Sequence, residues 1–342
     1  STGDIDVYDG IYRLRIMSNI EDDRVDMIVS LRPGFESQCP ANLTIPSYGV
    51  TEIANFYNCT NLESVTLPNS IVRIGGGAFN GCTNLKSINI PDGVSSIGNS
   101  AFMGCTSLKN ITIPNSVTTL ENLAFAQSGL TSVTVPDSVT SMEAAFYECA
   151  DLESVMLGRG ITSIGDSAFM GCTSLTDITI PNTVTTIEDQ AFWNCTSLES
   201  IIIPEGVTSI GKLAFAECTN LKQVDLPDSL TDLDPSAFYG SPCLQNMTLP
   251  GGLTTIPAYS FRDRTDLTSY DIPYGTITIG SQAFQGCTNL TSVTIPGSVT
   301  FIDNSAFSGC SSLTSVTIPA GVTELNNGVF QSCTGLTSVT IP

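Results

Sequence analysis

The sequence predicts a mostly β solenoid of about thirteen coils, built from parallel strands along a chain of 342 residues. Three observations predict this fold class: a phenylalanine recurs every 23 residues, each unit carries a short alternation of apolar and polar residues, and a proline follows that alternation. One such unit cannot bury its apolar face alone, so successive coils must stack and extend a single core along one axis.

The N-terminal segment is the first element, and it does not follow the 23-residue period. It contains β-prone pieces such as residues 11–16, where apolar and polar residues alternate. The end coil of a solenoid leaves its core uncovered and needs a polar lid. We therefore predict a β-rich N-terminal cap over residues 1–42 and a repeat solenoid over residues 43–342.

The most regular repeat, residues 283–305, assigns a structure to each part of the unit. Val293 and Ile295 flank Thr294, which is the period-two pattern of a strand with one buried face. Pro296 follows at once and ends the strand, because it has no N–H to donate to a neighbouring strand. A second alternation over residues 299–302 predicts a short strand on another face. Strands that return at a fixed period in every coil must be parallel.

The recurring phenylalanine marks the far side of the coil. Thirteen of the fifteen phenylalanines share one register, with steps of 23 residues and a single step of 21. They are Phe56, Phe79, Phe102, Phe125, Phe146, Phe169, Phe192, Phe215, Phe238, Phe261, Phe284, Phe307 and Phe330. We expect their rings to stack from coil to coil, so that residues sharing a position in the unit form a column.

Ten of the twelve cysteines occupy one position, three residues after the repeat phenylalanine. They are Cys59, Cys82, Cys105, Cys149, Cys172, Cys195, Cys218, Cys287, Cys310 and Cys333. Disulfides need opposed Cβ vectors, which a parallel column does not supply. Ser128, Ser241 and Arg264 take this position in other coils, so the thiol is replaceable. We predict buried structural thiols in this cysteine column, and ordinary core or loop positions for Cys39 and Cys243.

The unit resembles the 23-residue class of bacterial leucine-rich repeat found in BspA-like surface proteins. The pattern L-x-x-(V/I)-x-(I/L)-P-x-x-(V/L)-x-x-I-x-x-x-A-F-x-x-C is met closely over residues 62–82, 85–105, 175–195, 198–218 and 290–310. The resemblance implies a right-handed leucine-rich-repeat solenoid. It also implies a secreted or surface-anchored bacterial protein, since members of this class are typically found there. Some are adhesins that bind host matrix proteins such as fibronectin and fibrinogen.

Charge and composition exclude several classes of function. The net charge of −21 opposes binding to nucleic acid or to anionic membrane surfaces, because both depend on clusters of Lys and Arg. No stretch approaches the roughly 18 consecutive apolar residues of a membrane span, so no membrane insertion is predicted. The chain has no histidine, which removes Ser-His-Asp and Cys-His catalysis and histidine zinc sites. We predict no catalytic residue, no cofactor and no metal site, and thus no enzyme.

A candidate binding surface is found where the repeat departs from its own average. The outward strand position is usually threonine, and the residue after the repeat phenylalanine is usually small or polar near the C-terminal end. The departures from these two patterns are Met156, Ile202, Asp225 and Asp271 on the strand, and Tyr147, Met170, Trp193, Tyr239 and Arg262 after the phenylalanine. Aromatic residues and arginine dominate the energetics of interfaces. Alternatively, these side chains simply cover the edge of the core.

The predicted function is an adhesin-like scaffold, secreted or on the bacterial cell surface, that binds another macromolecule. The first hypothesis is that the partner is a protein. The family resemblance implies host extracellular matrix proteins. A second hypothesis is a carbohydrate-binding surface module in which Tyr147, Trp193 and Tyr239 stack on sugar rings. A third is a passive spacer. The sequence identifies neither the ligand nor the face that binds it.

Overall fold

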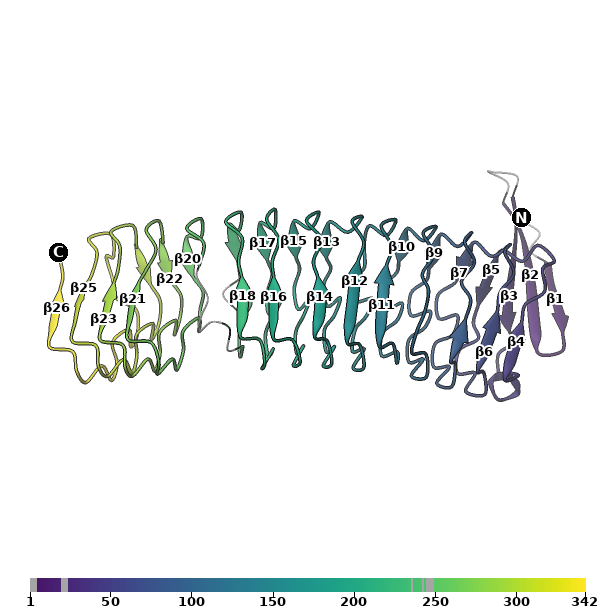
Figure 1. Cartoon of the computed structure of the whole chain (residues 1–342), viewed down its shortest axis with the longest axis horizontal. Coiled ribbons are helices and arrows are strands. Elements are labelled where there is room, and N and C mark those ends of the chain that lie inside the picture. The colour runs from purple at the N-terminus through teal and green to yellow at the C-terminus, as the bar shows by residue number, and fades with distance from the viewer. Residues whose placement is uncertain (1–4, 20–23, 235, 242, 244–248) are drawn as a thin grey trace. The chain divides into compact units, whose positions relative to one another are not determined.

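The computed structural model describes residues 5–19, 24–234, 236–241, 243 and 249–342. The chain is a mostly β solenoid of about thirteen turns, with short parallel strands that recur along the coils (Figure 1). This confirms the predicted fold class. Among the described residues, no helix is both long enough and apolar enough to span a membrane.

The coils form two compact units, Ser1–Thr183 with Asn194–Leu198, and Val184–Trp193 with Glu199–Pro342. The elements of the first unit are β1 Ile5–Asp9, β2 Tyr12–Asn19, β3 Arg24–Leu31, the 3₁₀ helix η1 Glu36–Gln38, β4 Asn42–Thr44, β5 Glu52–Ala54, β6 Ser64–Thr66, β7 Arg73–Ile74, β8 Ser87–Ile88, β9 Ser96–Ile97, β10 Thr119–Leu120, β11 Ser132–Val135, β12 Ser154–Leu157, β13 Ser163–Ile164 and β14 Asp177–Thr179. Those of the second unit are β15 Thr186–Ile187, β16 Ser200–Ile202, β17 Ser209–Ile210, β18 Gln223–Asp225, β19 Asp232–Leu233, β20 Thr255–Ile256, β21 Ser269–Asp271, β22 Thr278–Ile279, β23 Ser292–Thr294, β24 Phe301–Ile302, β25 Ser315–Thr317 and β26 Ser338–Thr340.

Each coil contributes to two faces, as its two alternating segments predict. In the first unit the strands after each leucine form the sheets β4–β6–β8 and β11–β12–β14, and the second segments form β5–β7–β9–β10. In the second unit β16–β18, β21–β23 and β25–β26 share the first face, and β15–β17–β19 and β20–β22–β24 the second. We call the first of these two faces the strand face.

The N-terminal strands join the second face. Strands β1, β2 and β3 pair antiparallel, and β3 then pairs parallel with β5 (Figure 1). The ring of Tyr12 on β2 lies 6.2 Å from that of Phe56, so an aromatic side chain of the N-terminal strands packs beside the first ring of the repeat. The division into a cap at residues 1–42 and a solenoid at residues 43–342 stays a prediction.

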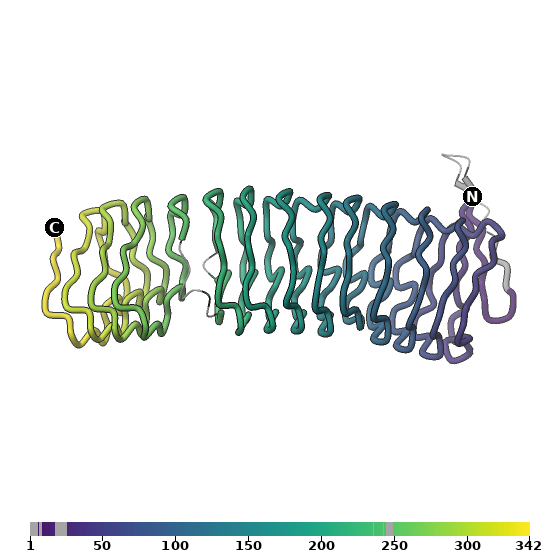
Figure 2. Tube along the Cα trace, viewed as in Figure 1, coloured from purple at the N-terminus to yellow at the C-terminus, as the bar shows by residue number. Residues whose placement is uncertain are grey.

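The repeat phenylalanines stack in columns, as the register predicts. Successive ring centroids lie 5.3–6.1 Å apart from Phe56 to Phe169 in the first unit. The stacked pairs of the second unit lie 4.8–5.6 Å apart. Most of these rings are fully buried, whereas Phe301, which is outside the register, is exposed. Figure 2 shows the coils of the first unit following one another in a regular series. The phenylalanine column is therefore continuous from Phe56 to Phe169 in the first unit. In the second unit it forms two stacks among the described residues, Phe192 to Phe238 and Phe261 to Phe330.

Two left-handed residues flank most of the buried rings. In the Phe125 coil they are Leu123 at φ 59° and Gln127 at φ 54°, two residues before and two residues after the phenylalanine. In the Phe261 coil they are Tyr259 at φ 63° and Asp263 at φ 59°. A non-glycine residue in this region costs roughly 1–2 kcal/mol, so stacking must hold the turn in place.

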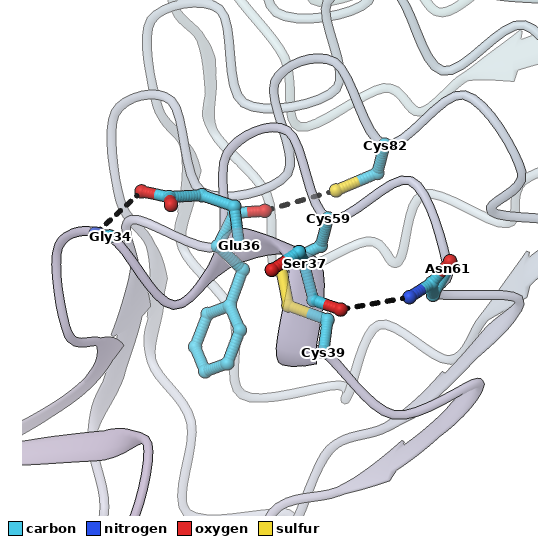
Figure 3. The surroundings of a disulfide bond; sticks show 8 residues. Gly34, Glu36, Ser37, Cys39, Cys59, Asn61 and Cys82 are labelled. Atoms are coloured by element: carbon cyan, nitrogen blue, oxygen red, sulfur yellow. Dashed lines mark hydrogen bonds between the residues drawn. A yellow bond between two sulfur atoms is a disulfide. The ribbon is translucent and has the colours of Figure 1, made fainter.

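The prediction for two cysteines was wrong: Cys39 and Cys59 form a disulfide, with their Cα atoms 5.6 Å apart (Figure 3). Cys59 is the first member of the cysteine column, and no earlier repeat supplies a thiol below it. Cys39 directly follows η1 and bonds Cys59 from outside the cysteine column. Asn61 Nδ2 also donates to the Ser37 carbonyl at 3.1 Å, which ties this segment to the first coil.

The nine other cysteines of the column keep buried thiols, and this part of the prediction is confirmed. Each of the nine thiols donates to the carbonyl oxygen of the phenylalanine in the preceding coil, at 2.9–3.2 Å. Ser241 replaces the thiol with a hydroxyl and donates to Phe215 O at 2.7 Å. Burial raises the pKa of Cys82 to about 12 and that of Cys149 to about 11, so these thiols carry little thiolate at neutral pH.

Replacing Cys172 tests the role of this hydrogen bond. Cys172→Ala removes one of two donors to the Phe146 carbonyl, and we expect it to lower the free energy of unfolding by about 1–2 kcal/mol. Cys172→Ser keeps a donor, as Ser241 does, and should cost less than the alanine variant. Urea denaturation followed by circular dichroism measures both. An equal cost for the two variants would show that the column is held by packing alone.

Candidate binding surfaces

The strand face presents one outward side chain per coil between two inward apolar residues, because successive strand residues point to opposite sides. Its described members are Thr66, Asn89, Thr112, Thr134, Met156, Thr179, Ile202, Asp225, Asp271, Thr294, Thr317 and Thr340, and all are exposed. Met156 is 66% exposed and Ile202 is 72% exposed. On a face of short polar side chains, these two are the apolar groups available for a partner to bury.

A groove of about 670 Å³ lies on the strand face of the first unit. Thr112, Thr134 and Met156 line it from successive coils, and Asp177 on β14 also lines it. Met156 on β12 is paired in register with Thr134 on β11 and Thr179 on β14. The groove thus combines hydroxyl groups, one carboxylate and one exposed thioether.

The strand face is interrupted beside this groove. Residues 110–113 occupy the place of a strand but form none, so β4–β6–β8 and β11–β12–β14 are separate sheets. Across the described part of the chain, no backbone hydrogen bond joins residues 110–113 to a neighbouring coil. Asn89 bonds the coil on the other side: its Oδ1 accepts from Leu67 N at 2.9 Å, and its Nδ2 donates to Leu67 O at 3.1 Å. Residues 110–113, which help to line the groove, therefore keep unpaired backbone donors and acceptors.

The candidate residues of the strand group lie where the alternation predicts. Met156 belongs to the first unit and lines its groove. Ile202 and Asp225 are register partners on β16 and β18 in the second unit. Asp271 on β21 is paired with Thr294 on β23. The structure thus joins Ile202 to Asp225 in neighbouring strands, and it places Met156 in a groove to which the others do not contribute.

The candidate residues of the second group lie on the turns after the repeat phenylalanines. Tyr147 and Met170 in the first unit and Trp193 in the second are half-buried, whereas Tyr239 and Arg262 are exposed. Tyr239 and Arg262 line one pocket of about 550 Å³ in the second unit, and Trp193 does not. The pocket therefore brings Tyr239 and Arg262 together. The half-buried members of the group partly cover the surface of their turns.

This turn pocket also contains residues that the candidate set lacked. The rings of Tyr239 and Tyr259 meet edge to face with centroids 5.7 Å apart, and the Arg262 guanidinium lies 5.8 Å from the centre of the Tyr259 ring. Glu217 lines the pocket from the preceding turn, and Arg264 from the Phe261 turn. The signal that could have found Tyr259 and Arg264 is the irregular composition of residues 238–275, where tyrosine and arginine gather.

Arg264 takes the position that a thiol fills in most coils. Its side chain is buried, and it bonds the Asp266 carboxylate twice, Nε to Oδ1 at 2.9 Å and Nη2 to Oδ2 at 2.5 Å. The hydrogen bonds from Arg264 lower the pKa of Asp266 below its ordinary value. A buried guanidinium is stable only with such a partner, because an unpaired buried charge is costly. Arg262 pairs with Asp263 at 3.4 Å.

Comparisons with known proteins agree with the repeat. A family model described as the BspA type leucine-rich repeat region matches residues 34–145, 142–268 and 254–342. A leucine-rich repeat protein from Bacteroides ovatus is 27% identical, with a TM-score of 0.64 over 98% of this chain and 88% of that one. A leucine-rich cell surface protein from Faecalibacterium prausnitzii is 29% identical, with a TM-score of 0.56 over 98% and 94%.

A third solved structure supports the fold alone. It is a leucine-rich repeat protein from Eubacterium ventriosum, 23% identical, with a TM-score of 0.54 over 93% of this chain and 92% of that one. No curated protein sequence matches the chain.

Proposed function

This chain belongs to the BspA-type leucine-rich repeat family, and from that premise we propose that it is a scaffold that binds another protein through the strand face of its first unit. We further propose that it acts outside the cell or on the bacterial cell surface, as an adhesin. Binding rather than catalysis is the proposed role, since the chain contains no histidine.

The main support for this proposal is the groove that residues 110–113 help to line. It offers an exposed methionine, which adapts its shape to a partner, within a row of hydroxyl groups. The unpaired backbone groups of residues 110–113 can bond the main chain of an extended segment that lies in the groove. An extended protein segment is therefore the ligand that this groove fits best. The net charge of −21 favours a partner with a basic surface.

Two observations support the proposed location. The Faecalibacterium prausnitzii protein, which is 29% identical, is described as a cell surface protein. The Cys39–Cys59 disulfide is of a kind that persists in oxidising compartments and is rare in the cytosol. The buried thiols of Cys82 and Cys149 are compatible with such a compartment, because burial raises the pKa of each and thiols that carry little thiolate oxidise slowly.

Surface plasmon resonance with immobilised fibronectin and fibrinogen tests the proposal. These matrix proteins are chosen because the family resemblance implies them. We expect Met156→Asp to weaken binding at least tenfold, about 1.4 kcal/mol, through loss of apolar contact in the groove. Aspartate already occupies the same position as Asp225 and Asp271, so the fold should tolerate it.

Ile202→Asp is the matched control, because Ile202 holds the same position in the second unit and is equally exposed. Its affinity for the matrix protein should stay within about twofold of the parent chain. No binding to either protein at ~10 μM, or an equal loss in the two variants, would argue against the first-unit groove. Absence of binding would favour a passive spacer.

A further inference from the structure

The turns after the repeat phenylalanines are normally tied to the next coil by backbone hydrogen bonds. Phe215 N donates to Ala237 O, and Glu217 N donates to Tyr239 O, each at 2.7 Å. Such bonds are missing one coil later: within the described ranges, no backbone hydrogen bond joins the turn at residues 238–241 to the turn at residues 260–263. The turn pocket of about 550 Å³ lies at this separation.

Arg264 gives a local reason for the separation. In regular coils a small thiol or hydroxyl at this position donates to the carbonyl of the preceding phenylalanine, as Ser241 does to Phe215 O at 2.7 Å. Arg264 bonds Asp266 of its own turn instead, so the Phe238 carbonyl does not receive this interaction. A long, buried side chain therefore replaces a short coil-to-coil contact. The coil opens toward solvent at its turn.

At this turn Tyr239, Tyr259 and Arg262 contact one another. Tyr259 has a φ of 63°, a region that a bulky residue seldom adopts, and its ring meets that of Tyr239 at an interplanar angle of 82°. The Arg262 guanidinium also contacts the Tyr259 ring, 5.8 Å from its centroid. Tyr239 is 45% exposed and lines the pocket, so its ring is available to stack on a ligand.

Both guanidinium groups of the pocket are already paired with carboxylates. Arg262 pairs with Asp263 and Arg264 with Asp266, and Glu217 adds a further carboxylate. An anionic ligand would meet these carboxylates, and a cationic ligand would meet both guanidinium groups. A neutral ligand with many hydroxyl groups can donate to the carboxylates and accept from the guanidinium groups at once. The apolar C–H face of a pyranose ring packs well on an aromatic ring.

We infer that this turn pocket, centred on Tyr239, Tyr259 and Arg262, binds a neutral oligosaccharide. Its volume of about 550 Å³ lies within the ~300–1,000 Å³ of small-molecule sites. The site belongs to the second unit and uses none of the first-unit groove residues, so it is a second binding activity, independent of the proposed protein partner. Tyr147 and Trp193 do not line it, which leaves Tyr239 as the stacking residue shared with the sequence-based carbohydrate hypothesis.

Isothermal titration calorimetry of the intact chain tests this inference with four neutral probes and one acidic probe. The neutral probes are cellotetraose, mannotetraose, xylotetraose and galactotetraose, and the acidic probe is tetragalacturonate. We expect at least one neutral probe to bind with a Kd below ~1 mM and tetragalacturonate to bind at least tenfold more weakly. No binding of any neutral probe, or tighter binding of the acidic one, would overturn the inference.

Two variants test whether the neutral probe binds in this pocket. Tyr239→Ala should weaken the affinity for the bound neutral probe at least tenfold, and Glu217→Gln about fivefold, because each removes a ligand contact without changing the core. Tyr274→Ala is the matched control: Tyr274 is 86% exposed in the same unit and lies outside the pocket. Met156→Asp should also leave sugar binding unchanged. An unaltered Kd in Tyr239→Ala would remove this pocket as the site.

Discussion

Phe146→Ala is expected to lower the free energy of unfolding of the first unit by about 3–5 kcal/mol, as truncation of a buried aromatic residue does. The Phe146 ring is fully buried between those of Phe125 and Phe169, each 5.6 Å away and within 6° of parallel. Its removal leaves a cavity on both sides of one coil and interrupts the phenylalanine column. Because a solenoid is stabilised by contacts between neighbouring coils, the loss should weaken the coils on either side.

Urea denaturation followed by far-ultraviolet circular dichroism measures this effect. Phe301→Ala is the matched control, since Phe301 makes the same change in side-chain volume but is 39% exposed on β24. We expect the control to cost less than about 1 kcal/mol. Equal costs for the two variants would contradict the view that the column, rather than total apolar content, stabilises the coils.

Replacing both Cys39 and Cys59 with serine is expected to lower the free energy of unfolding by about 3 kcal/mol. The disulfide closes a loop with a sequence separation of 20 residues, and the chain-entropy model assigns about 3 kcal/mol to a loop of that size. The loss should be felt first at the N-terminal coil, because the bond joins η1 to the turn after Phe56 (Figure 3). Urea denaturation measures the total, and hydrogen exchange locates it.

A reductant supplies the control within the same experiment. Dithiothreitol should lower the stability of the parent chain by about the same amount and leave the double serine variant unchanged. Cys172→Ser, which alters a column thiol that is not in a disulfide, should still respond to the reductant as the parent does. Identical unfolding curves for the parent with and without dithiothreitol would contradict a stabilising disulfide.

The fold could be predicted because each coil repeats the same local sequence pattern. The alternation Val293-Thr294-Ile295 sets a strand with one buried face, and the recurring phenylalanine sets the column. Once parallel register is assumed, every residue in one position of the unit shares an environment. The outward exposure of Met156 and Ile202 followed from that reasoning and is confirmed.

The departures from the repeat could not be predicted in the same way. Cys39 lies outside the period, so no column argument placed it beside Cys59. The grouping of Met156 with residues 110–113 depends on a break in the backbone pairing, which the regular spacing of Ile111 and Ile113 does not reveal. The turn pocket depends on how far two turns separate, and that distance reflects where the Arg264 side chain goes.

The sequence by itself determined the coil, its two strand segments, the two columns of phenylalanine and cysteine, and the acidic surface. These follow from periodicity and composition, because residues that share a position in the repeat line up in a column when the coils stack. The tertiary structure alone decided which cysteines pair, where the strand face opens into a groove, and which tyrosines meet at a turn. The groove and the turn pocket arise where one coil fails to bond its neighbour in the usual way, which depends on the packing of side chains from several coils at once. The disulfide arises because a segment outside the repeat packs against the first coil.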